Sequence, residues 1–222
     1  MKDLSHIRCI LWDLDGTLQD SYGLILSSFR HATRTVLGRV IPDAELMQKV
    51  GQPLAVQMRD FTDDPYVQAE LVRVYRDHNE RVHDEALREF PGMREAVASL
   101  AAAGYTLGVV TSKRHELAWH GLEVCGLDGY MSLLVGSDDC PEHKPDPGPV
   151  RLGCKLAGYA PEECLYVGDS PFDMAAARGA GCVTAAALWG MFPRDVMEAA
   201  YPDYLCEDVA DLVALLPGPP VR

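Results

Sequence analysis

Two carboxylates placed two residues apart are the first side chains in this chain that could carry out chemistry. Asp13 and Asp15 come directly after the short apolar run Ile7–Trp12, and Gly16 follows them. A strand that ends here, with a glycine turn behind it, would hold both carboxylates at one strand tip. One could then act as a nucleophile and the other as a general acid and base. Because Asp-x-Asp-Gly is also a common turn sequence, the motif needs support from elsewhere in the chain.

Three more polar segments supply groups that suit the same chemistry. Thr111 and Ser112 follow an apolar run, Lys144 lies in a proline-stiffened Lys-Pro-Asp-Pro turn, and Asp169 and Asp173 lie at a strand-to-helix junction. Taken singly, the lysine could be a solvated surface residue, the threonine a strand-end hydroxyl, and Asp169 a residue that interacts with the helix dipole. Their order at successive strand ends favours one shared site.

A parallel sheet would bring these side chains together. Buried parallel strands are typically short apolar runs, and the chain has five: residues 7–12, 105–110, 131–135, 165–167 and 182–188. Helical segments lie between the later runs: one is opened by Pro91 and closed by Gly104, and another opens at Ser170-Pro171. This alternation predicts a doubly wound, Rossmann-like α/β core with a mainly parallel sheet, whose ligands bind at the carboxyl ends of the strands.

Residues 19–90 interrupt this alternation. They show no strand pattern, and apolar residues at helical spacing predict three helices, over 22–38, 43–51 and from 64 onward. Asp43 is expected to cap the second of these helices, and Asp64-Pro65 to start the third. We therefore predict an α/β core of residues 1–18 and 91–222, with an all-helical cap of residues 19–90 inserted after the first strand.

The composition excludes several classes of function. The 222 residues carry 20 Lys and Arg against 33 Asp and Glu, which gives a formal net charge of −13. Such a surface repels nucleic-acid backbones and anionic lipids, so neither partner is expected. The longest uncharged stretch, residues 96–112, is interrupted by Ser and Gly and is shorter than the ~20 apolar residues of a membrane-spanning helix. Seven cysteines with no C-x-x-C pair favour reduced thiols and a cytoplasmic location.

Together, the four polar segments resemble the four sequence motifs of the haloacid dehalogenase superfamily. The matching stretches are Asp13-Leu14-Asp15-Gly16-Thr17, Thr111, Lys144 and Gly168-Asp169-x-x-x-Asp173. The predicted helical insert resembles the C1 cap of that superfamily, and the resemblance covers essentially the whole chain. It implies catalysis at the strand tips of the core, under a helical lid that excludes water and selects the substrate.

The resemblance also implies the catalytic roles. Asp13 would be the nucleophile that forms an aspartyl-phosphate, and Asp15 would protonate the leaving group and later activate water. Mg²⁺ would be held by the carboxylates of Asp13 and Asp169 and by the backbone carbonyl of Asp15. The acid at position 15 fits phosphatases and phosphomutases, because dehalogenases and P-type ATPases of the superfamily have another residue there.

The resemblance implies that the remaining matched residues bind the substrate phosphoryl group or support the metal. Thr111, with Ser112 beside it, and Lys144 would bind the phosphoryl oxygens, and Asp173 would support water on the metal. Charge arithmetic also favours a cation, because the four aspartates and Lys144 together leave −3, which would repel a phosphate dianion. Mg²⁺ changes that sum to −1, and a protonated Asp15 changes it to zero. Hard oxygen ligands suit Mg²⁺ better than zinc.

We therefore expect a Mg²⁺-dependent phosphatase that acts on a small phosphorylated substrate. Two alternatives remain: a sugar phosphomutase, in which Asp13 passes the phosphoryl group onward, and a non-catalytic regulator that binds phosphorylated metabolites. The sequence is compatible with a monomer or a homodimer.

Closer kinship points to the bacterial pyrophosphatase branch, which neighbours the phosphoglycolate phosphatases. The similar segments are Ile25–Phe29, Gly51-Gln52-Pro53-Leu54 and His83-Asp84-Glu85. Two residues depart from the pattern: Gln19 stands where an aliphatic residue is usual, and Gln52 is neutral where a basic side chain could bind a substrate carboxylate. Gln52 is therefore a candidate specificity residue that favours pyrophosphate over 2-phosphoglycolate, although loop residues are also often simple surface residues.

Overall fold

The computed structural model describes residues 4–216 and 218 of the chain. Its centre is a six-stranded sheet in the order β5-β4-β1-β6-β7-β8, in which all neighbouring strands are parallel. The strands are β1 (Cys9–Trp12), β4 (Thr106–Val110), β5 (Leu133–Val135), β6 (Cys164–Gly168), β7 (Val183–Ala187) and β8 (Tyr204–Cys206). The predicted doubly wound core is confirmed, and each of the five apolar runs overlaps a strand. The sequence does not predict β8, because its apolar run is limited to the three residues between Asp203 and Glu207, whereas the run around β5 is five residues long.

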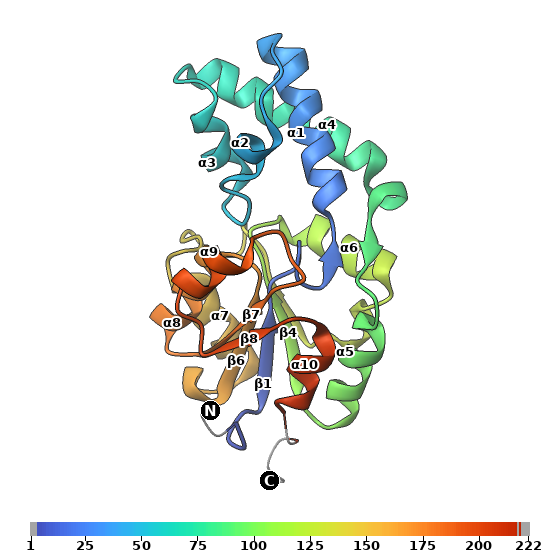
Figure 1. The fold of residues 1–222 in the computed structure, drawn as a ribbon, viewed down its shortest axis with the longest axis vertical. Coiled ribbons are helices and arrows are strands. Elements are labelled where there is room, and N and C mark those ends of the chain that lie inside the picture. Colours follow the sequence, from blue (N-terminus) through green and yellow to red (C-terminus); the bar gives the residue numbers. More distant parts are fainter. Residues whose placement is uncertain (1–3, 217, 219–222) are drawn as a thin grey trace.

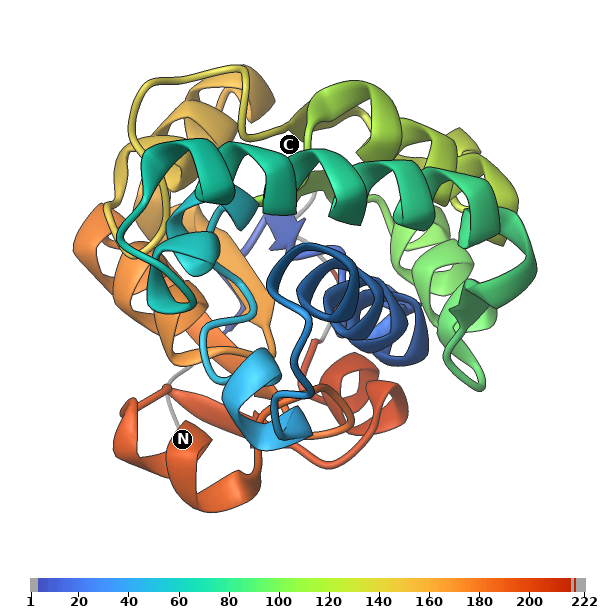
Figure 2. The same cartoon turned by 90° about the horizontal axis from the view of Figure 1, so that it is seen from above.

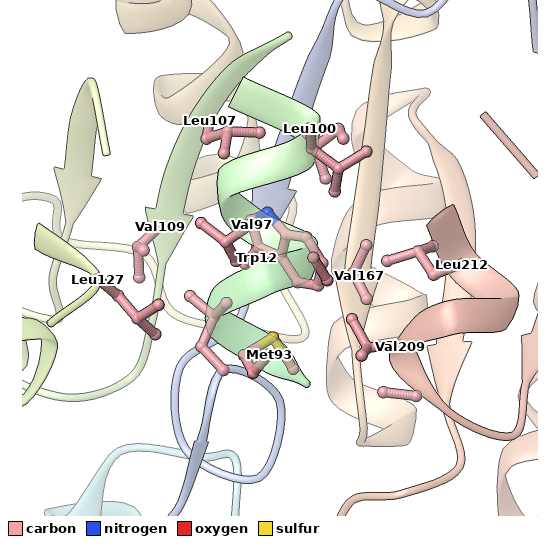
Figure 3. Packing of buried hydrophobic residues seen from close by; sticks show 14 of the residues in the cluster. Trp12, Met93, Val97, Leu100, Leu107, Val109, Leu127, Val167, Val209 and Leu212 are labelled. Carbon is pink, nitrogen blue, oxygen red and sulfur yellow. The ribbon is translucent and has the colours of Figure 1, made fainter. Parts of the chain in front are cut away.

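Helices cover both faces of this sheet. One face packs against α5 (Met93–Ala102), α6 (His115–Cys125) and α10 (Val209–Ala214), and the other against α7 (Gly148–Ala157) and α8 (Pro171–Ala180). In β1, Ile10 and Trp12 join the first cluster while Cys9 and Leu11 join the second, as the two-residue period of a strand requires. Figure 3 shows α5 and α10 packed around the fully buried Trp12.

Shorter elements complete the core. The helix α9 (Arg194–Ala199) packs Met197 against Met174 and Ala186. Two 3₁₀ turns, Asp128–Tyr130 and Pro161–Glu163, precede β5 and β6.

The remaining helices form a cap over the carboxyl ends of the strands (Figure 1). The long helices are α1 (Tyr22–Leu37) and α4 (Pro65–Ala86), and α2 (Asp43–Met47), α3 (Leu54–Gln57) and the 3₁₀ turn Met58–Asp60 connect them. The cap has a hydrophobic cluster of its own, in which Phe29 packs edge-on against Tyr75 with ring centroids 4.9 Å apart. Seen from above, α4 runs across the whole top of the molecule (Figure 2). The predicted helical cap is thus present.

Helix starts within the cap agree only in part with the sequence. The α4 helix begins after Asp64, whose carboxylate accepts hydrogen bonds from the backbone N–H groups of Tyr66 and Val67, as expected. The prediction for Asp43 is wrong: Pro42 holds the capping position in an extended conformation, and Asp43 is the first helical residue. That helix also ends at Met47 rather than at Gly51, so several residues before Gly51 form a loop.

Two short strands join the cap to the core. Gln19–Asp20 (β2) pairs antiparallel with Arg88–Glu89 (β3), with Gln19 opposite Glu89. The expectation of no strand within residues 19–90 is therefore wrong at its two ends, because two residues cannot show a strand period. The exact division of core and cap at residues 18/19 and 90/91 stays a prediction.

Two further expectations concern the surroundings of the protein. Among the described residues, no helix has the length and apolar character needed to cross a bilayer. All seven cysteines are free thiols.

Candidate active site

Three neighbouring strands bring the predicted site residues to one edge of the sheet. β1 lies between β4 and β6, and Trp12 is in register with both Val109 and Val167. Asp13 follows Trp12 directly, and Thr111 and Asp169 come two residues after Val109 and Val167, so Asp13 is near Thr111 on one side and Asp169 on the other. All three side chains are almost completely buried. The parallel register thus explains why motifs far apart in the sequence form one site.

Lys144 is a buried ion-pair partner of two aspartates. Its Nζ lies 2.8 Å from Asp13 Oδ1 and 2.6 Å from Asp173 Oδ1, and the residue is 3% exposed. Burial alone would lower the pKa of the lysine, but the two carboxylates outweigh it and hold that pKa well above its usual value. A solvated surface lysine is therefore excluded. The ammonium contacts the nucleophile candidate directly, and Lys144 is not among the residues that line the cavity described below.

Tyr166 is a member of this cluster that the sequence did not single out. Its hydroxyl donates to the backbone carbonyl of Val110 at 2.9 Å and lies 3.2 Å from Asp173 Oδ1 and 3.3 Å from Lys144 Nζ. The residue is fully buried within β6. Within an apolar strand, a tyrosine normally indicates core packing, so the sequence pattern gives no sign that its hydroxyl belongs to the site.

The start of α8 fixes Asp173. The backbone N–H of Ser170 donates to Asp173 Oδ2 at 3.1 Å, and the backbone N–H of Asp173 donates to Ser170 Oγ at 3.2 Å. This reciprocal arrangement is a capping box, which satisfies two backbone donors at the helix start. Asp173 is therefore held by its own helix while its other oxygen faces Lys144.

Asp169 is held by backbone groups of two loops. Its Oδ2 accepts a hydrogen bond of 2.7 Å from the backbone N–H of Met191. Gly16 approaches it so closely that a Cβ built on the glycine would lie 2.2 Å from Asp169 Oδ2, and its φ of +82° also favours glycine. The glycine of the Asp-x-Asp-Gly motif is thus required by the contact between the β1 loop and Asp169.

The acidic cluster fits a hard divalent cation. Carboxylate oxygens of Asp13, Asp169 and Asp173 lie within 4.8 Å of one another. Burial, and then the charge of Asp173, raise the pKa of Asp13 to about 7 despite the attraction of Lys144. Burial, followed by the charges of Asp173 and Asp13, raises the pKa of Asp169 well above its usual value. Buried carboxylates with unbalanced negative charge and oxygen donors are what Mg²⁺ sites provide.

Asp15 has a different environment from these acids. Lys113 Nζ lies 2.9 Å from its Oδ1, and Gln19 Nε2 donates to the same oxygen at 2.7 Å. Burial acts to raise the pKa of Asp15, but Lys113 and Gln19 prevail and lower it, so the group is ionised. Lys113 also corrects the charge count: four aspartates and two lysines leave −2, which a divalent cation alone would neutralise. A protonated Asp15 is not needed for that balance.

A cavity of about 210 Å³ lies between the core and the cap. Its core side includes Asp13, Asp15, Thr111, Ser112, Lys113 and Asp169, and its cap side includes Gln52, Gln57, Arg76, Asn79, Phe29 and Tyr75. Lys144 and Asp173 contact Asp13 but are not part of this lining. The cavity is therefore charged on the core side, whereas the cap side combines apolar rings and amides with the charged side chains of Arg76 and Glu80.

The loop at Gly51 touches the core. The Ser112 hydroxyl donates to the Gly51 carbonyl at 2.6 Å, so this predicted phosphate ligand is engaged with the cap. Gly51 has a φ of +100°, and a Cβ there would lie 2.9 Å from Ser170 Oγ. Thr111 Oγ1 accepts the backbone N–H of Lys113 at 3.2 Å. The cap thus sits against the catalytic edge through this loop.

Several cap residues of the cavity were missed by sequence reasoning. Gln52 lines the cavity as predicted, and its carbonyl accepts a hydrogen bond of 2.7 Å from Gln57 Nε2. Arg76 and Asn79 are three residues apart on α4 and reach the same space. That spacing puts them on one helix face. The sequence alone does not show that this face points toward the core, so it predicts no site there.

Comparison with known proteins agrees with this geometry. The family model for haloacid dehalogenase-like hydrolases matches residues 10–187, which include all the clustered aspartates and lysines. The chain belongs to this family.

Relatives and solved structures indicate which members of the family this chain is similar in kind to: pyrophosphatases and phosphoglycolate phosphatases. A Caldanaerobacter subterraneus protein named "Putative pyrophosphatase PpaX" is 38% identical over 96% of both chains. A Bacillus cereus protein named "Pyrophosphatase PpaX" is 34% identical over 95% of this chain and 96% of its own. A Haemophilus somnus crystal structure titled "predicted phosphoglycolate phosphatase" is 27% identical, with a TM-score of 0.87 over 95% of this chain and 98% of that one. The predicted family, fold and enzyme class, a phosphatase of this branch, are confirmed.

Proposed function

We propose that this protein hydrolyses a small phosphorylated substrate with Mg²⁺ and through a phosphorylated Asp13, with pyrophosphate as the preferred substrate. The observation that carries the proposal is the buried cluster of Asp13, Asp169, Asp173 and Lys144 at adjacent strand tips, next to a cavity closed by the cap. Buried charges of this density are kept at functional sites because they are unfavourable elsewhere.

Mg²⁺ would be held by the Asp13 and Asp169 carboxylates and by the backbone carbonyl of Asp15, with Asp173 outside them. When bound, the ion supplies positive charge that offsets the negative charge of the substrate phosphate and of the transition state. The raised pKa of Asp13 supports this assignment, because a nearby cation would return that carboxylate to its ionised, nucleophilic form.

The protein residues then divide the reaction into two displacements. In the first, an Asp13 carboxylate oxygen attacks phosphorus, an Asp13–phosphorus bond forms, and the bond to the leaving group breaks. In the second, Asp15 takes a proton from water, the water oxygen attacks phosphorus, and Asp13 is released as a carboxylate. Lys144, 2.8 Å from Asp13 Oδ1, orients the nucleophile throughout.

The ionisation state of Asp15 favours a substrate with a good leaving group. Lys113 and Gln19 keep Asp15 ionised, which suits a base in the second displacement. In the first displacement Asp15 must gain a proton before it can pass one to the leaving group, so a leaving group that needs little protonation reacts best. The phosphate released from pyrophosphate is a much weaker base than the alkoxide released from phosphoglycolate.

The cap side of the cavity supports the same substrate class. Gln52 offers an amide and Arg76 a guanidinium to the distal end of a bound molecule. Both suit a second phosphate, and the relatives named pyrophosphatase PpaX agree with this preference. The cytoplasmic location and the oligomeric state stay predictions.

Metal depletion tests the proposal most directly. Protein stripped with EDTA should lose hydrolysis of p-nitrophenyl phosphate, and Mg²⁺ should restore it. Asp169→Asn should raise the Mg²⁺ concentration needed for half-maximal activity, whereas the exposed Asp195→Asn serves as the control. Full activity after verified metal removal would overturn the metal role. No phosphate release from pyrophosphate, 2-phosphoglycolate or p-nitrophenyl phosphate would overturn the proposed function itself.

A further inference from the structure

A second group of metal-ligating side chains lies outside the catalytic cluster, where the cap returns to the core. His83 and Asp84 belong to the last turn of α4, and His120 belongs to α6. His83 Nδ1 and His120 Nε2 lie 2.9 and 2.8 Å from the same oxygen of Asp84. One oxygen and two ring nitrogens therefore converge on one point, although 36 residues separate Asp84 from His120.

The spacing of the two imidazoles is compatible with their binding one metal ion together. Their ring centroids are 5.3 Å apart with an interplanar angle of 31°, and the three candidate ligand atoms lie within 4.8 Å of one another. A tetrahedral zinc site with bonds of about 2.0–2.1 Å separates its ligand atoms by about 3.4 Å. The Asp84 contacts would lengthen slightly on binding. Asp84 and His120 side chains are 61% and 45% exposed and can make that adjustment.

The surroundings also resemble those of a metal site. The other ring nitrogen of His120, Nδ1, lies 3.7 Å from Glu123 Oε2, so a carboxylate stands behind this ligand. The distance is longer than a hydrogen bond, and a small approach of the exposed Glu123 side chain would let its carboxylate orient a metal-bound His120. The exposed side of Asp84 leaves room for water as a fourth ligand.

We propose that His83, Asp84 and His120 form a second metal site that binds Zn²⁺, separate from the all-oxygen site at Asp13. Two imidazoles and one carboxylate suit zinc, whereas the catalytic cluster offers only hard oxygen atoms, which suit Mg²⁺. Because two ligands come from the end of the cap helix and one from the core, the bound ion would link α4 to α6. The proposal does not depend on the identity of the substrate or on phosphatase activity.

Calorimetric titration of the full-length protein with Zn²⁺, in a large excess of Mg²⁺, tests the site. The Mg²⁺ occupies the oxygen site, so one Zn²⁺ should bind per chain. His120→Asn should weaken this binding at least ~10-fold, because loss of even an outer partner of a ligand reduces affinity by ~10–100-fold. His115→Asn is the matched control, since His115 is equally exposed and also pairs with an aspartate, Asp139, at 2.6 Å.

Two further measurements keep the outcome clear. Co²⁺ in place of Zn²⁺ should give the visible absorption of a low-coordinate nitrogen-containing site in wild type and His115→Asn, and not in His120→Asn. If His120→Asn does not fold, as judged by circular dichroism, Glu123→Gln replaces it and should weaken Zn²⁺ binding ~10-fold. The proposal would be overturned if wild type bound no Zn²⁺, or if His120→Asn or its replacement Glu123→Gln bound Zn²⁺ as tightly as wild type. The cluster would then be only a hydrogen-bond network.

Discussion

The cavity has a floor formed by the core and a roof formed by the cap, and the two differ in the kind of side chain that they present. On the core side, charged groups are buried and fixed by strands, a helix start and backbone contacts, and Asp13, Lys144, Asp169 and Asp173 are each at most 3% exposed. On the cap side, apolar rings and the amides of Gln52, Gln57 and Asn79 face the same space. Chemistry common to all phosphate substrates thus lies on the rigid side, and contacts that can differ between substrates lie on an inserted unit.

The largest effect should follow from changing the nucleophile on the floor. Asp13→Asn keeps the side-chain shape but is a far poorer nucleophile, so kcat should fall by ~10⁴-fold or more. Asp20→Asn is the control, because Asp20 is exposed and its carboxylate accepts the backbone N–H of Tyr22. Rapid quenching of wild type with labelled substrate should trap phosphate on protein. Unchanged turnover in Asp13→Asn would end the covalent mechanism.

Asp15→Asn should have the next largest effect. It keeps the backbone carbonyl proposed as a metal ligand but removes acid and base catalysis, which is worth ~10²–10⁴-fold in rate. When phosphoenzyme formation limits the rate, the loss should be smaller for p-nitrophenyl phosphate than for an alkyl phosphate. Comparing kcat/KM for the two esters checks this. Equal losses would mean that Asp15 does not handle the leaving-group proton.

Stability without metal should reveal the unbalanced charge of the floor. The pKa of Asp13 rises from 3.8 to about 7 on folding, so between these values the folded chain holds a proton that the unfolded chain has lost. Stability present at acidic pH is therefore lost as pH rises toward 7, by on the order of 4 kcal/mol for this group. Urea unfolding at about pH 5 and pH 8 in EDTA captures about 3 kcal/mol of this loss, because the rest occurs below pH 5. Mg²⁺ or Asp13→Asn should reduce it, and an unchanged slope in Asp13→Asn would assign it to other groups.

A charge added to the roof should change selectivity rather than chemistry. Gln52→Arg should shift the kcat/KM ratio of 2-phosphoglycolate to pyrophosphate upward by ~10–100-fold, because charge-assisted hydrogen bonds contribute ~1.5–3 kcal/mol. Gln48→Arg adds the same charge to an exposed cap position that is not among the cavity residues, and should leave the ratio unchanged. A ratio that does not move in Gln52→Arg would show that this loop does not contact substrate.

The contact between floor and roof should give the smallest effect. Ser112→Ala removes the hydrogen bond to Gly51, worth about 0.5–1.5 kcal/mol, so KM should rise by ~2–10-fold at nearly constant kcat. Ser99→Ala removes a similar hydroxyl bond within α5 and is the control. If kcat falls strongly in Ser112→Ala, the hydroxyl binds the phosphoryl group instead, as the sequence resemblance implies.

The sequence was informative where structure depends on local patterns. Apolar runs located five of the six strands of the main sheet, and Asp64-Pro65 located the start of α4, because these signals lie within a few neighbouring residues. Side-chain partners between elements could not be predicted. Lys113 lies 98 positions from Asp15, and Tyr166 has the appearance of an ordinary core residue. Arg76 entered the site only through the placement of α4 over the sheet, which no local pattern records.

The paired strands β2 and β3 have a consequence for how such an enzyme can change over time. Gln19 and Glu89 face each other, so the polypeptide leaves the core and re-enters it at nearly one point. Insertions are tolerated where the two ends of the inserted piece lie close together. A whole lid could therefore be exchanged, lengthened or removed as a module without displacing the strands that carry Asp13 and Asp169. New substrate ranges could then arise by grafting at this junction, while the ancestral reaction centre is inherited intact.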